Sequence, residues 1–352
     1  MSIPVKKAIS KKRTGFLVIL FSFFLILLML VSSGMGYVKI SFIEILKIVF
    51  AEITDKKELL KNIDQTLKLV VMEVRLPRII TCAAVGGALS VSGAIFQGIL
   101  LNPLADPYTL GISAGAAFGA CIAIFLNFGM AVVSVPLFAF TGACSTLFFV
   151  IFFSSSGKNS FGKLSSNNLI LSGIIVGAIL SAGISFLKYT ADEQVSIMIF
   201  WLMGSFASRT WLDACLILVF LAAGLITTLF FARDLNLISL GERSASSLGV
   251  NTKAVTLILL VVGSLLAAIS VSVSGIIGFV GLLVPHMVRL VTGPDNRKLI
   301  PISMIAGAGL LLTADTITRA VLPHEIPIGV LTALIGGPVF CWIFKKHQLG
   351  KG

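Results

Sequence analysis

The stretch that decides the fold covers residues 75–111 and reads RLPRIITCAAVGGALSVSGAIFQGILLNPLADPYTLG. Two arginines flank a proline at its start, and the chain is then uncharged for about the 20 residues that a helix needs to cross a bilayer core. It closes on residues 102–107, NPLADP, where two prolines prevent a continuous helix. The stretch predicts a membrane-spanning helix inside a bundle rather than at its rim, because small residues that let helix backbones approach one another recur through its middle: Gly86, Gly87, Ser90, Ser92, Gly93 and Gly98.

The composition of the whole chain also indicates a membrane protein. Of its 352 residues, 57% are hydrophobic and 12% are charged, and the mean hydropathy is +1.05. A soluble domain of this size needs far more charge to cover its surface. The net charge of +12 does not indicate nucleic-acid binding, because the basic residues form short clusters between apolar runs, as in cytoplasmic loops that face anionic lipid. We therefore expect a polytopic protein of the cell membrane.

Neither the cysteines nor the N-terminus changes that interpretation. The basic cluster at residues 6–13 precedes an apolar run, as in a secretory signal, but the run over residues 15–31 is long for that role. Residues 32–35, SSGM, form a poor cleavage site, so we interpret the run as an uncleaved first span. Buried single thiols behave as small hydrophobes, and we expect neither a disulfide nor a metal site from the five scattered cysteines: Cys82, Cys121, Cys144, Cys215 and Cys341.

The uncharged stretches predict an all-α fold of about ten membrane-spanning helices. An even number places both termini on one side, and the basic N-terminus with Lys345 and Lys346 indicates that this side is the cytoplasm. The predicted spans are residues 15–34, 78–101, 109–127, 131–153, 167–187, 212–232, 254–273, 276–291, 299–320 and 327–344. The chain then divides into a basic cytoplasmic N-terminus (1–14), the first span (15–34), an outer segment (35–74), a core (75–345) with an inner loop at 236–252, and a cytoplasmic tail (346–352).

Two further segments carry a helical pattern. Residues 192–206, DEQVSIMIFWLMGSF, are apolar but short, and predict a half-helix that re-enters the membrane from outside. Residues 37–53 in the outer segment predict an amphipathic helix at the outer interface. Opposite Lys39 and Lys47, its apolar residues at helical spacing are Ile40, Ile43, Leu46, Val49 and Phe50.

The chain also contains a short motif that occurs twice. Residues 90–93 and 272–275 both read SVSG, and a proline follows each at the same offset, Pro103 and Pro285. Five predicted spans separate the two copies. Two interpretations stay open: an inverted repeat of five helices, or chance similarity between apolar segments rich in small residues.

Three motifs are candidates for function. Arg75 and Arg78 lie at the predicted outer end of the span. They either anchor this end by extending their charged groups to the membrane interface, or bind carboxylates of a docking protein through their planar guanidinium groups. Residues 240–250, LGERSASSLGV, predict a short cytoplasmic helix closed by Gly249, which either fits a groove on another protein or is a plain surface helix. Asp315 and Arg319 stand four positions apart and are predicted to pair.

The segment at residues 102–111 is predicted to be a tight inner turn between two helices. The turn residues are Asn102, Pro103, Asp106 and Pro107, with Asp106 near the start of the next helix, while Gly93 serves helix packing.

Taken together, these motifs resemble the FecCD family of ABC-importer permeases, which take up iron–siderophores, haem or cobalamin. The resemblance covers roughly residues 75–344, and the motifs occur in the family's order. They are RLPR, NPLADPYTLG, FWLMGSF, LGERSASSLGV, GFVGLLVPHMVRL, TADTITR, and LPHEIPIG with GGPVF.

The resemblance implies a dimer of ten-span permeases, pairing with itself or with a homologous sister, two cytoplasmic ATPases that bind the ATP, and an external substrate-binding protein. Arg75, Arg78 and Arg319 are similar to the arginines that receive acidic residues of that binding protein. Ser166 and Asn167 match positions at the cytoplasmic gate, although Asn167 departs from the small hydroxyl residues typical there. The coupling residues that contact the ATPases would be Leu240, Gly241, Glu242, Ala245, Leu248 and Gly249. The implied cargo is an iron–siderophore complex, followed by haem and cobalamin.

Two other classes of protein fit the sequence less well. The chain has no phosphate-binding GxxxxGK[ST] loop, so we expect no ATP hydrolysis and no cofactor in this subunit. A secondary transporter driven by protons or sodium usually carries an ionisable group near the bilayer midplane, whereas the charged residues here fall near the ends of spans. A membrane-embedded enzyme is disfavoured because His286, His324 and His347 are widely separated. His324 beside Glu325 would either touch a haem or metal cargo or be a loop histidine.

Overall fold

The computed structural model describes residues 11–36, 38, 40–56, 63–128, 131–155, 165–320 and 325–349. Every regular element in those ranges is a helix. Seven of them belong to stretches long and apolar enough to cross a membrane: α1 (Lys11–Gly34), α4 (Leu76–Ile99), α6 (Ala131–Ser154), α7 (Ser166–Thr190), α9 (Trp211–Phe230), α12 (Thr252–Ser274) and α14 (Asn296–Ala320). Three more are largely apolar but shorter: α5 (Ile112–Phe125), α13 (Val280–Thr292) and α15 (Ile328–Leu349).

The ten predicted spans fall on these ten helices, and the crossing of the three shorter ones stays a prediction. Two of the shorter helices begin later than predicted, because left-handed residues delay them: Gly111 (φ 74°) precedes α5 and Phe279 (φ 68°) precedes α13. The other elements are α2 (Phe42–Thr54), α3 (Gln65–Leu69), η2 (Val70–Arg75), η3 (Pro107–Leu110), α8 (Val195–Leu202), α10 (Ala232–Ile238) and α11 (Glu242–Ser247).

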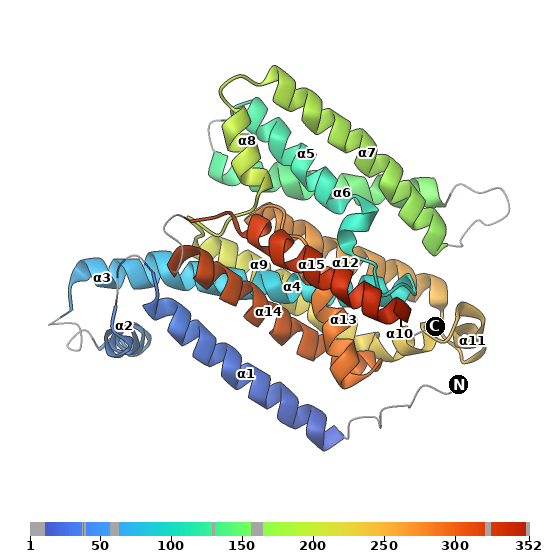
Figure 1. The fold of residues 1–352 in the computed structure, drawn as a ribbon, viewed down its shortest axis with the longest axis horizontal. Helices are drawn as coiled ribbons and strands as arrows, with labels where there is room; N and C mark the ends of the chain where they lie inside the picture. Colours follow the sequence, from blue (N-terminus) through green and yellow to red (C-terminus); the bar gives the residue numbers. More distant parts are fainter. Residues whose placement is uncertain are drawn as a thin grey trace.

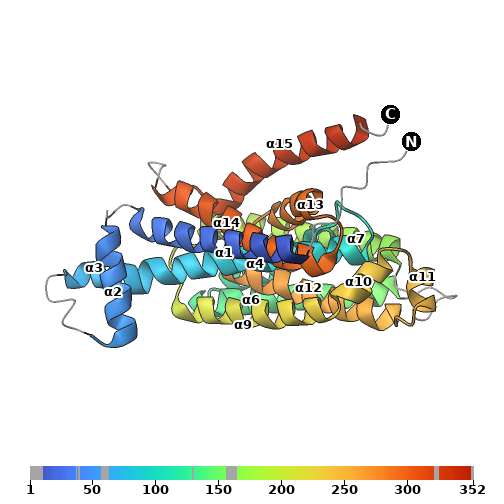
Figure 2. The ribbon, with the colours of Figure 1, turned by 90° about the horizontal axis from the view of Figure 1, so that it is seen from below.

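The helices run roughly along the long axis of the molecule, with α2 and α3 at one end and α10 and α11 at the other (Figures 1 and 2). We call these the α2 end and the α11 end. The first turn of α1 and the last turn of α15 both lie toward the α11 end. This arrangement agrees with two termini on one side, while the assignment of that side to the cytoplasm stays a prediction.

Helix α4 is the centre of the bundle, as the small residues of its sequence predict. In an apolar window of 18 residues in the stretch that contains it, 94% of the residues are buried, against 6% and 17% in the corresponding windows of α1 and α7. Figure 1 shows α4 among α9, α12, α13 and α14, with α1 at the rim. The prediction of a central rather than peripheral helix is therefore confirmed.

Close backbone contact explains why α4 needs glycine. A Cβ atom on Gly93 would lie 1.8 Å from the carbonyl oxygen of Gly281 in α13, and one on Gly86 would lie 2.3 Å from that of Gly307 in α14. Ser92 adds a polar contact, because its hydroxyl donates a 2.6 Å hydrogen bond to the carbonyl of Gly263 in α12. Small residues thus allow van der Waals contact and interhelical hydrogen bonds at the same faces.

Replacing Gly93 with valine should therefore disrupt the fold. Its side chain meets backbone that cannot rotate away, so we expect a loss of about 3 kcal/mol or more, the upper range for overpacked cores. Thermal unfolding of the purified protein in detergent measures the loss. Gly309→Val is the matched control, since no atom lies within 4 Å of a Cβ at that helical position; equal stability of the two variants would contradict the packing argument.

The predicted amphipathic helix of the outer segment is present as α2. It begins with a capping box in which Ser41 caps the helix and the Glu44 carboxylate accepts from the Ser41 amide. Ile43 and Leu46, two residues of the predicted apolar face, are exposed. Ile45 and Ile48, which the prediction did not include, pack in one cluster with Val71 of η2, and Ile40 and Val49, which it did include, pack in the same cluster. The helix thus has two apolar sides; Tyr37 and Lys39 lie outside the described residues.

The segment after α8 joins three parts of the chain. The predicted half-helix at residues 192–206 contains the eight-residue α8, and its re-entry from outside stays a prediction. Ser205 donates its amide proton to the carbonyl of Ser274 at 2.8 Å, and Ile328 donates to Gly204 at 3.1 Å. The loop after α8 therefore holds the end of α12 and the start of α15 together.

The two SVSG copies adopt different local structures. Gly93 lies within helix α4, whereas Gly275 ends helix α12 with a φ of 72°. The repeated SVSG motif therefore gives no structural support to an inverted repeat of five helices, which stays a prediction.

Candidate functional sites at the two ends of the bundle

Five charged residues meet at the α2 end, and we call them the arginine cluster: Arg75, Arg78, Asp315, Arg319 and Glu325. Arg78, in the first turn of α4, donates from Nε and Nη2 to the Asp315 carboxylate at 3.1 Å and 2.9 Å. Its Nη1 donates to Glu325 Oε1 at 3.1 Å. The side chain of Asp315 is 1% exposed and that of Glu325 is 50% exposed. Arg78 therefore has one buried and one exposed carboxylate partner.

The other two arginines hold the end of α1. Arg319 donates to the carbonyl of Met35 at 2.7 Å and to the carbonyl of Ser32 at 2.5 Å. Arg75 donates to the carbonyl of Ser33 at 2.5 Å and to that of Val38. Carbonyls at a helix C-terminus lack partners within the helix and favour cations. These arginines therefore satisfy the last turn of α1.

The predicted pair of Asp315 and Arg319 is confirmed, with 3.4 Å between Oδ2 and Nε. The contacts that Arg78 makes with Asp315 and Glu325 were not predicted from the sequence. Arg75, Arg78 and Arg319, predicted to receive acidic residues of a binding protein, all have partners within the chain, and Arg75 is 5% exposed; their docking role stays a prediction. The highlighted motif LPHEIPIG contains Glu325, but nothing local to that motif indicates an arginine 247 residues away.

The predicted inner turn lies between α4 and α5. The Asn102 side chain accepts a 3.0 Å hydrogen bond from the amide of Leu104, and Asp106 accepts one of 2.9 Å from the amide of Tyr108. Pro107 starts the 3-10 helix η3, and Pro103 lies within the turn. Burial raises the pKa of Asp106 to about 6, and the hydrogen bond from Tyr108 opposes that rise. These contacts give residues 102–107 a structural part in the turn.

Helix α11 forms the predicted short helix within residues 240–250. Gly249 has a φ of 86° and donates to the Ser246 carbonyl at 3.0 Å, while Val250 donates to the Ala245 carbonyl at 3.1 Å. These two bonds define a Schellman motif, as expected for a glycine after the helix end. Ala245 is fully buried and fixes the helix to the bundle, while Leu240 and Leu248 are 70% and 63% exposed. Two exposed apolar side chains thus flank a helix that is fixed to the bundle.

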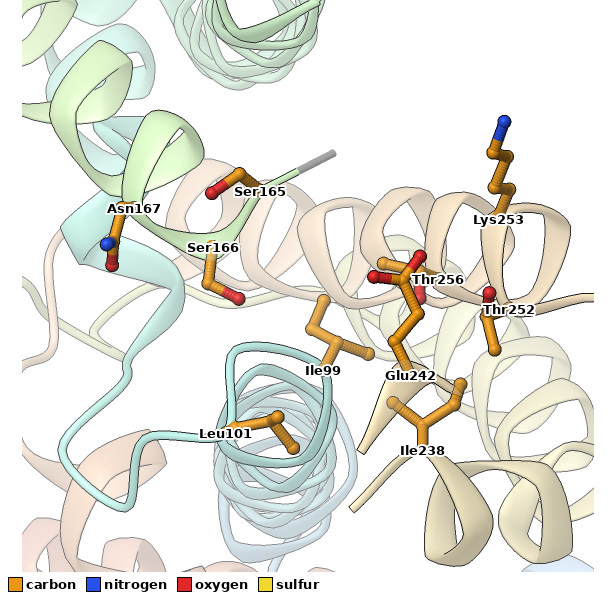
Figure 3. Close-up of a pocket in the computed structure, with 10 residues that line it drawn as sticks. All are labelled: Ile99, Leu101, Ser165, Ser166, Asn167, Ile238, Glu242, Thr252, Lys253 and Thr256. Carbon is orange, nitrogen blue, oxygen red and sulfur yellow. The ribbon is translucent and has the colours of Figure 1, made fainter. Parts of the chain in front are cut away.

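A cavity of about 440 Å³ lies beside α11. Figure 3 shows Ser165, Ser166 and Asn167 at the start of α7 on one side and Glu242 with Thr256 on the other. The structure therefore brings Ser166 and Asn167, predicted at a gate, to the same cavity as Glu242, predicted to couple to an ATPase. The remaining lining residues are Ile99, Leu101, Ile238, Thr252 and Lys253.

The described residues contain no group of three or more histidine, cysteine or acidic side chains that could hold a metal ion. His324, weighed above as a contact for haem or metal, lies outside the described residues.

Long apolar helices around a nearly uncharged centre, with charged side chains gathered at the ends, define a multi-pass membrane protein. The sequence model of the FecCD transport family matches residues 24–346. The chain belongs to this family, and so is a permease of the ABC-importer class in the cell membrane.

Individual relatives agree with that assignment. The chain is 40% identical over 288 residues to the cobalamin import system permease protein BtuC of Halobacterium salinarum, covering 82% of this chain and 76% of the relative. It is 37% identical over 342 residues to the hemin transport system permease protein HmuU of Yersinia pestis, covering 95% of each. Among solved structures, an inward-facing putative metal-chelate type ABC transporter matches with a TM-score of 0.81 at 33% identity, covering 94% of this chain and 98% of the other.

Proposed function

We propose that this chain is the transmembrane permease subunit of an ATP-driven importer that translocates an iron–siderophore complex delivered by an external binding protein. A second permease subunit, either a copy of this chain or a homologous sister, and two cytoplasmic ATPases complete the assembly. The observation that carries the proposal is α11, a helix that ends in a Schellman motif, is held to the bundle through the buried Ala245, and is flanked by the exposed Leu240 and Leu248 at one end of the bundle. Because the chain has no phosphate-binding loop, an ATP-driven mechanism requires such a surface to receive energy from a separate ATPase.

The cavity beside α11 suggests how the energy reaches the transport pathway. Glu242 in the first turn of α11 and Ser166 in the first turn of α7 line the same space. A displacement of α11 by an ATPase can therefore change the space available to the start of α7. Nucleotide binding would shift the permease between outward-open and inward-open states to the extent that the ATPases bind those states differently.

Helices α7 and α15 offer apolar surface for the second copy. Ile174, Ile175 and Ile179 of α7 are all more than half exposed, as are Leu334 and Ile335 of α15. Figure 2 shows α15 leaning away from the rest of the bundle. Such faces need lipid or another helix beside them, and the proposed dimer supplies helices at part of them.

Three cargoes are compatible with the family of this permease. The relatives named above are a cobalamin and a hemin permease at 40% and 37% identity, so overall similarity of the permease does not separate these cargoes. Iron–siderophore is our first choice, with haem and cobalamin as alternatives. The ligand bound by the importer's own binding protein distinguishes the three.

An ion-coupled secondary transporter is the rival mechanism. Among the described residues, the charged side chains that are buried in the bundle lie near helix ends: Arg75 at the end of η2, Asp106 before η3, and Asp315 and Arg319 in the last turns of α14. A carrier of protons or sodium usually needs such a group near the midplane.

Reconstitution tests the function. With the permease, its ATPase and its binding protein in proteoliposomes, we expect uptake of a ⁵⁵Fe-labelled siderophore only when ATP reaches the ATPase. An ATPase variant that cannot hydrolyse ATP is the control, and it should reduce uptake to the background of empty vesicles. Uptake by the permease alone under a proton or sodium gradient would contradict the proposal.

A further inference from the structure

The two carboxylates that contact Arg78 differ in how firmly they are held. Asp315 is 1% exposed, lies within helix α14 and also contacts Arg319. Glu325 is 50% exposed and lies on a non-helical segment, residues 325–327. Its Oε1 accepts from Arg78 Nη1 at 3.1 Å, and its Oε2 is 3.4 Å from both Nη1 and Nη2. Glu325 therefore covers the exposed edge of a guanidinium whose other edge Asp315 occupies.

This difference in burial makes only one of the pairs exchangeable. Breaking a buried pair leaves an uncompensated charge and is strongly unfavourable. An exposed pair contributes little, because water and salt compete with it. Glu325 can therefore leave Arg78 at small cost while Asp315 stays in place.

The surroundings leave room for an incoming group. A pocket of about 180 Å³ adjoins the pair and is lined by Arg78 and Glu325 together with Phe200, Ser205 and Phe206. These residues belong to the motifs RLPR, FWLMGSF and LPHEIPIG. The motifs FWLMGSF and LPHEIPIG therefore both contribute to the pocket next to Arg78.

We propose that Glu325 is an internal stand-in for a carboxylate of the external binding protein, which displaces Glu325 from Arg78 when it docks. The proposal rests on the function proposed above. The partner surface that fits is acidic, since the departure of Glu325 leaves three cations with one carboxylate, Asp315, and an incoming carboxylate restores the second partner of Arg78. The planar guanidinium favours a carboxylate that can accept two hydrogen bonds.

The exchange also connects docking to the helices below. Glu325 stands three positions before Ile328, the first residue of α15, whose amide donates to the carbonyl of Gly204. Gly329 donates to the carbonyl of Met203 at 3.0 Å. Release of Glu325 therefore frees the segment that leads into α15 next to the loop that follows α8. In this way, docking at Arg78 affects both the start of α15 and the loop after α8.

Glu325→Gln is the decisive variant, because it keeps the size of the side chain and removes the competing charge. The measurement is the Kd of the importer's own binding protein for the permease–ATPase complex in lipid nanodiscs. We expect binding about two- to fivefold tighter than wild type, the factor that corresponds to an exposed ion pair. Glu52→Gln is the matched control, since Glu52 also forms an exposed pair, with Lys68 at 2.8 Å, away from Arg78, and should leave Kd unchanged.

A second measurement needs no partner. The arginine reagent phenylglyoxal, followed by peptide mass spectrometry, should modify Arg78 several times faster in Glu325→Gln than in wild type or Glu52→Gln. If Glu325→Gln does not fold, Glu325→Ala takes its place, and the same faster modification of Arg78 is expected. Equal modification rates, or an unchanged or weaker Kd in the variant, would overturn the exchange while leaving the importer function intact. A wild-type complex that binds no binding protein at all overturns both proposals.

Discussion

Replacing Gly249 with tryptophan is expected to abolish transport and ATPase stimulation while the protein still inserts and folds. Gly249 has a φ of 86°, a conformation that L side chains rarely adopt, and no atom lies within 4 Å of a Cβ there. The tryptophan would therefore strain the Schellman motif and project from α11 into the surface proposed for the ATPase. ATP hydrolysis by the complex and cargo uptake in proteoliposomes are the two measurements.

Two further variants separate strain from obstruction. Gly249→Ala introduces the unfavourable φ, costing about 1 kcal/mol, but no bulk, and should retain most of the transport. Gly309→Trp is the control for added bulk, because Gly309 lies within helix α14, outside residues 240–250, and no atom lies within 4 Å of a Cβ there. Normal coupling in Gly249→Trp, or equal loss in Gly309→Trp, would contradict the assignment of α11.

Replacing Asp315 with leucine should cause a large loss of stability. Asp315 is fully buried and contacts Arg78 and Arg319, so its removal leaves two largely buried guanidinium groups without their shared carboxylate. Breaking a buried ion pair by removing one partner typically costs about 3–5 kcal/mol. Unfolding of the purified protein in increasing denaturant, followed by circular dichroism, measures this loss.

The control for Asp315→Leu is again Glu52→Gln, which removes an exposed ion pair and should cost less than about 1 kcal/mol. A third variant carries Arg78→Met together with Asp315→Leu. It should recover part of the lost stability, because one of the unpaired charges is gone. An Asp315→Leu protein as stable as Glu52→Gln would show that the cluster does not hold the α2 end together.

Features carried by neighbouring residues could be predicted from the sequence. The spacing of small residues in residues 78–101 correctly placed α4 inside the bundle, since helix packing depends on which side chains share a face. Gly249 correctly marked the end of α11, because a glycine after a helix adopts the left-handed conformation. The pair of Asp315 and Arg319 followed from helical spacing alone.

Features that join distant segments could not be predicted in this way. Arg78 and Asp315 are 237 residues apart, and only the packing of α14 on α4 brings them together. The same holds for Arg75, whose partners are carbonyls of the backbone and carry no sequence signal at all. In α2, the predicted apolar face omitted Ile45 and Ile48, because their burial depends on Val71 of η2, which lies more than 20 residues further along the chain.

The carbonyls that Arg75 and Arg319 hold at the end of α1 have an evolutionary consequence. Every residue type supplies a backbone oxygen, so this attachment constrains few side chains of α1; Ser32 is an exception, because its hydroxyl also accepts from Arg319 at 2.6 Å and lies 2.8 Å from the hydroxyl of Thr316. In an apolar window of 18 residues in α1, only 6% of the residues are buried, so its exposed apolar residues can be replaced by other apolar residues during evolution without weakening this attachment. The first helix is therefore where we expect relatives to drift furthest apart, as long as the turn at Ser32–Met35 still delivers its oxygens to the two arginines.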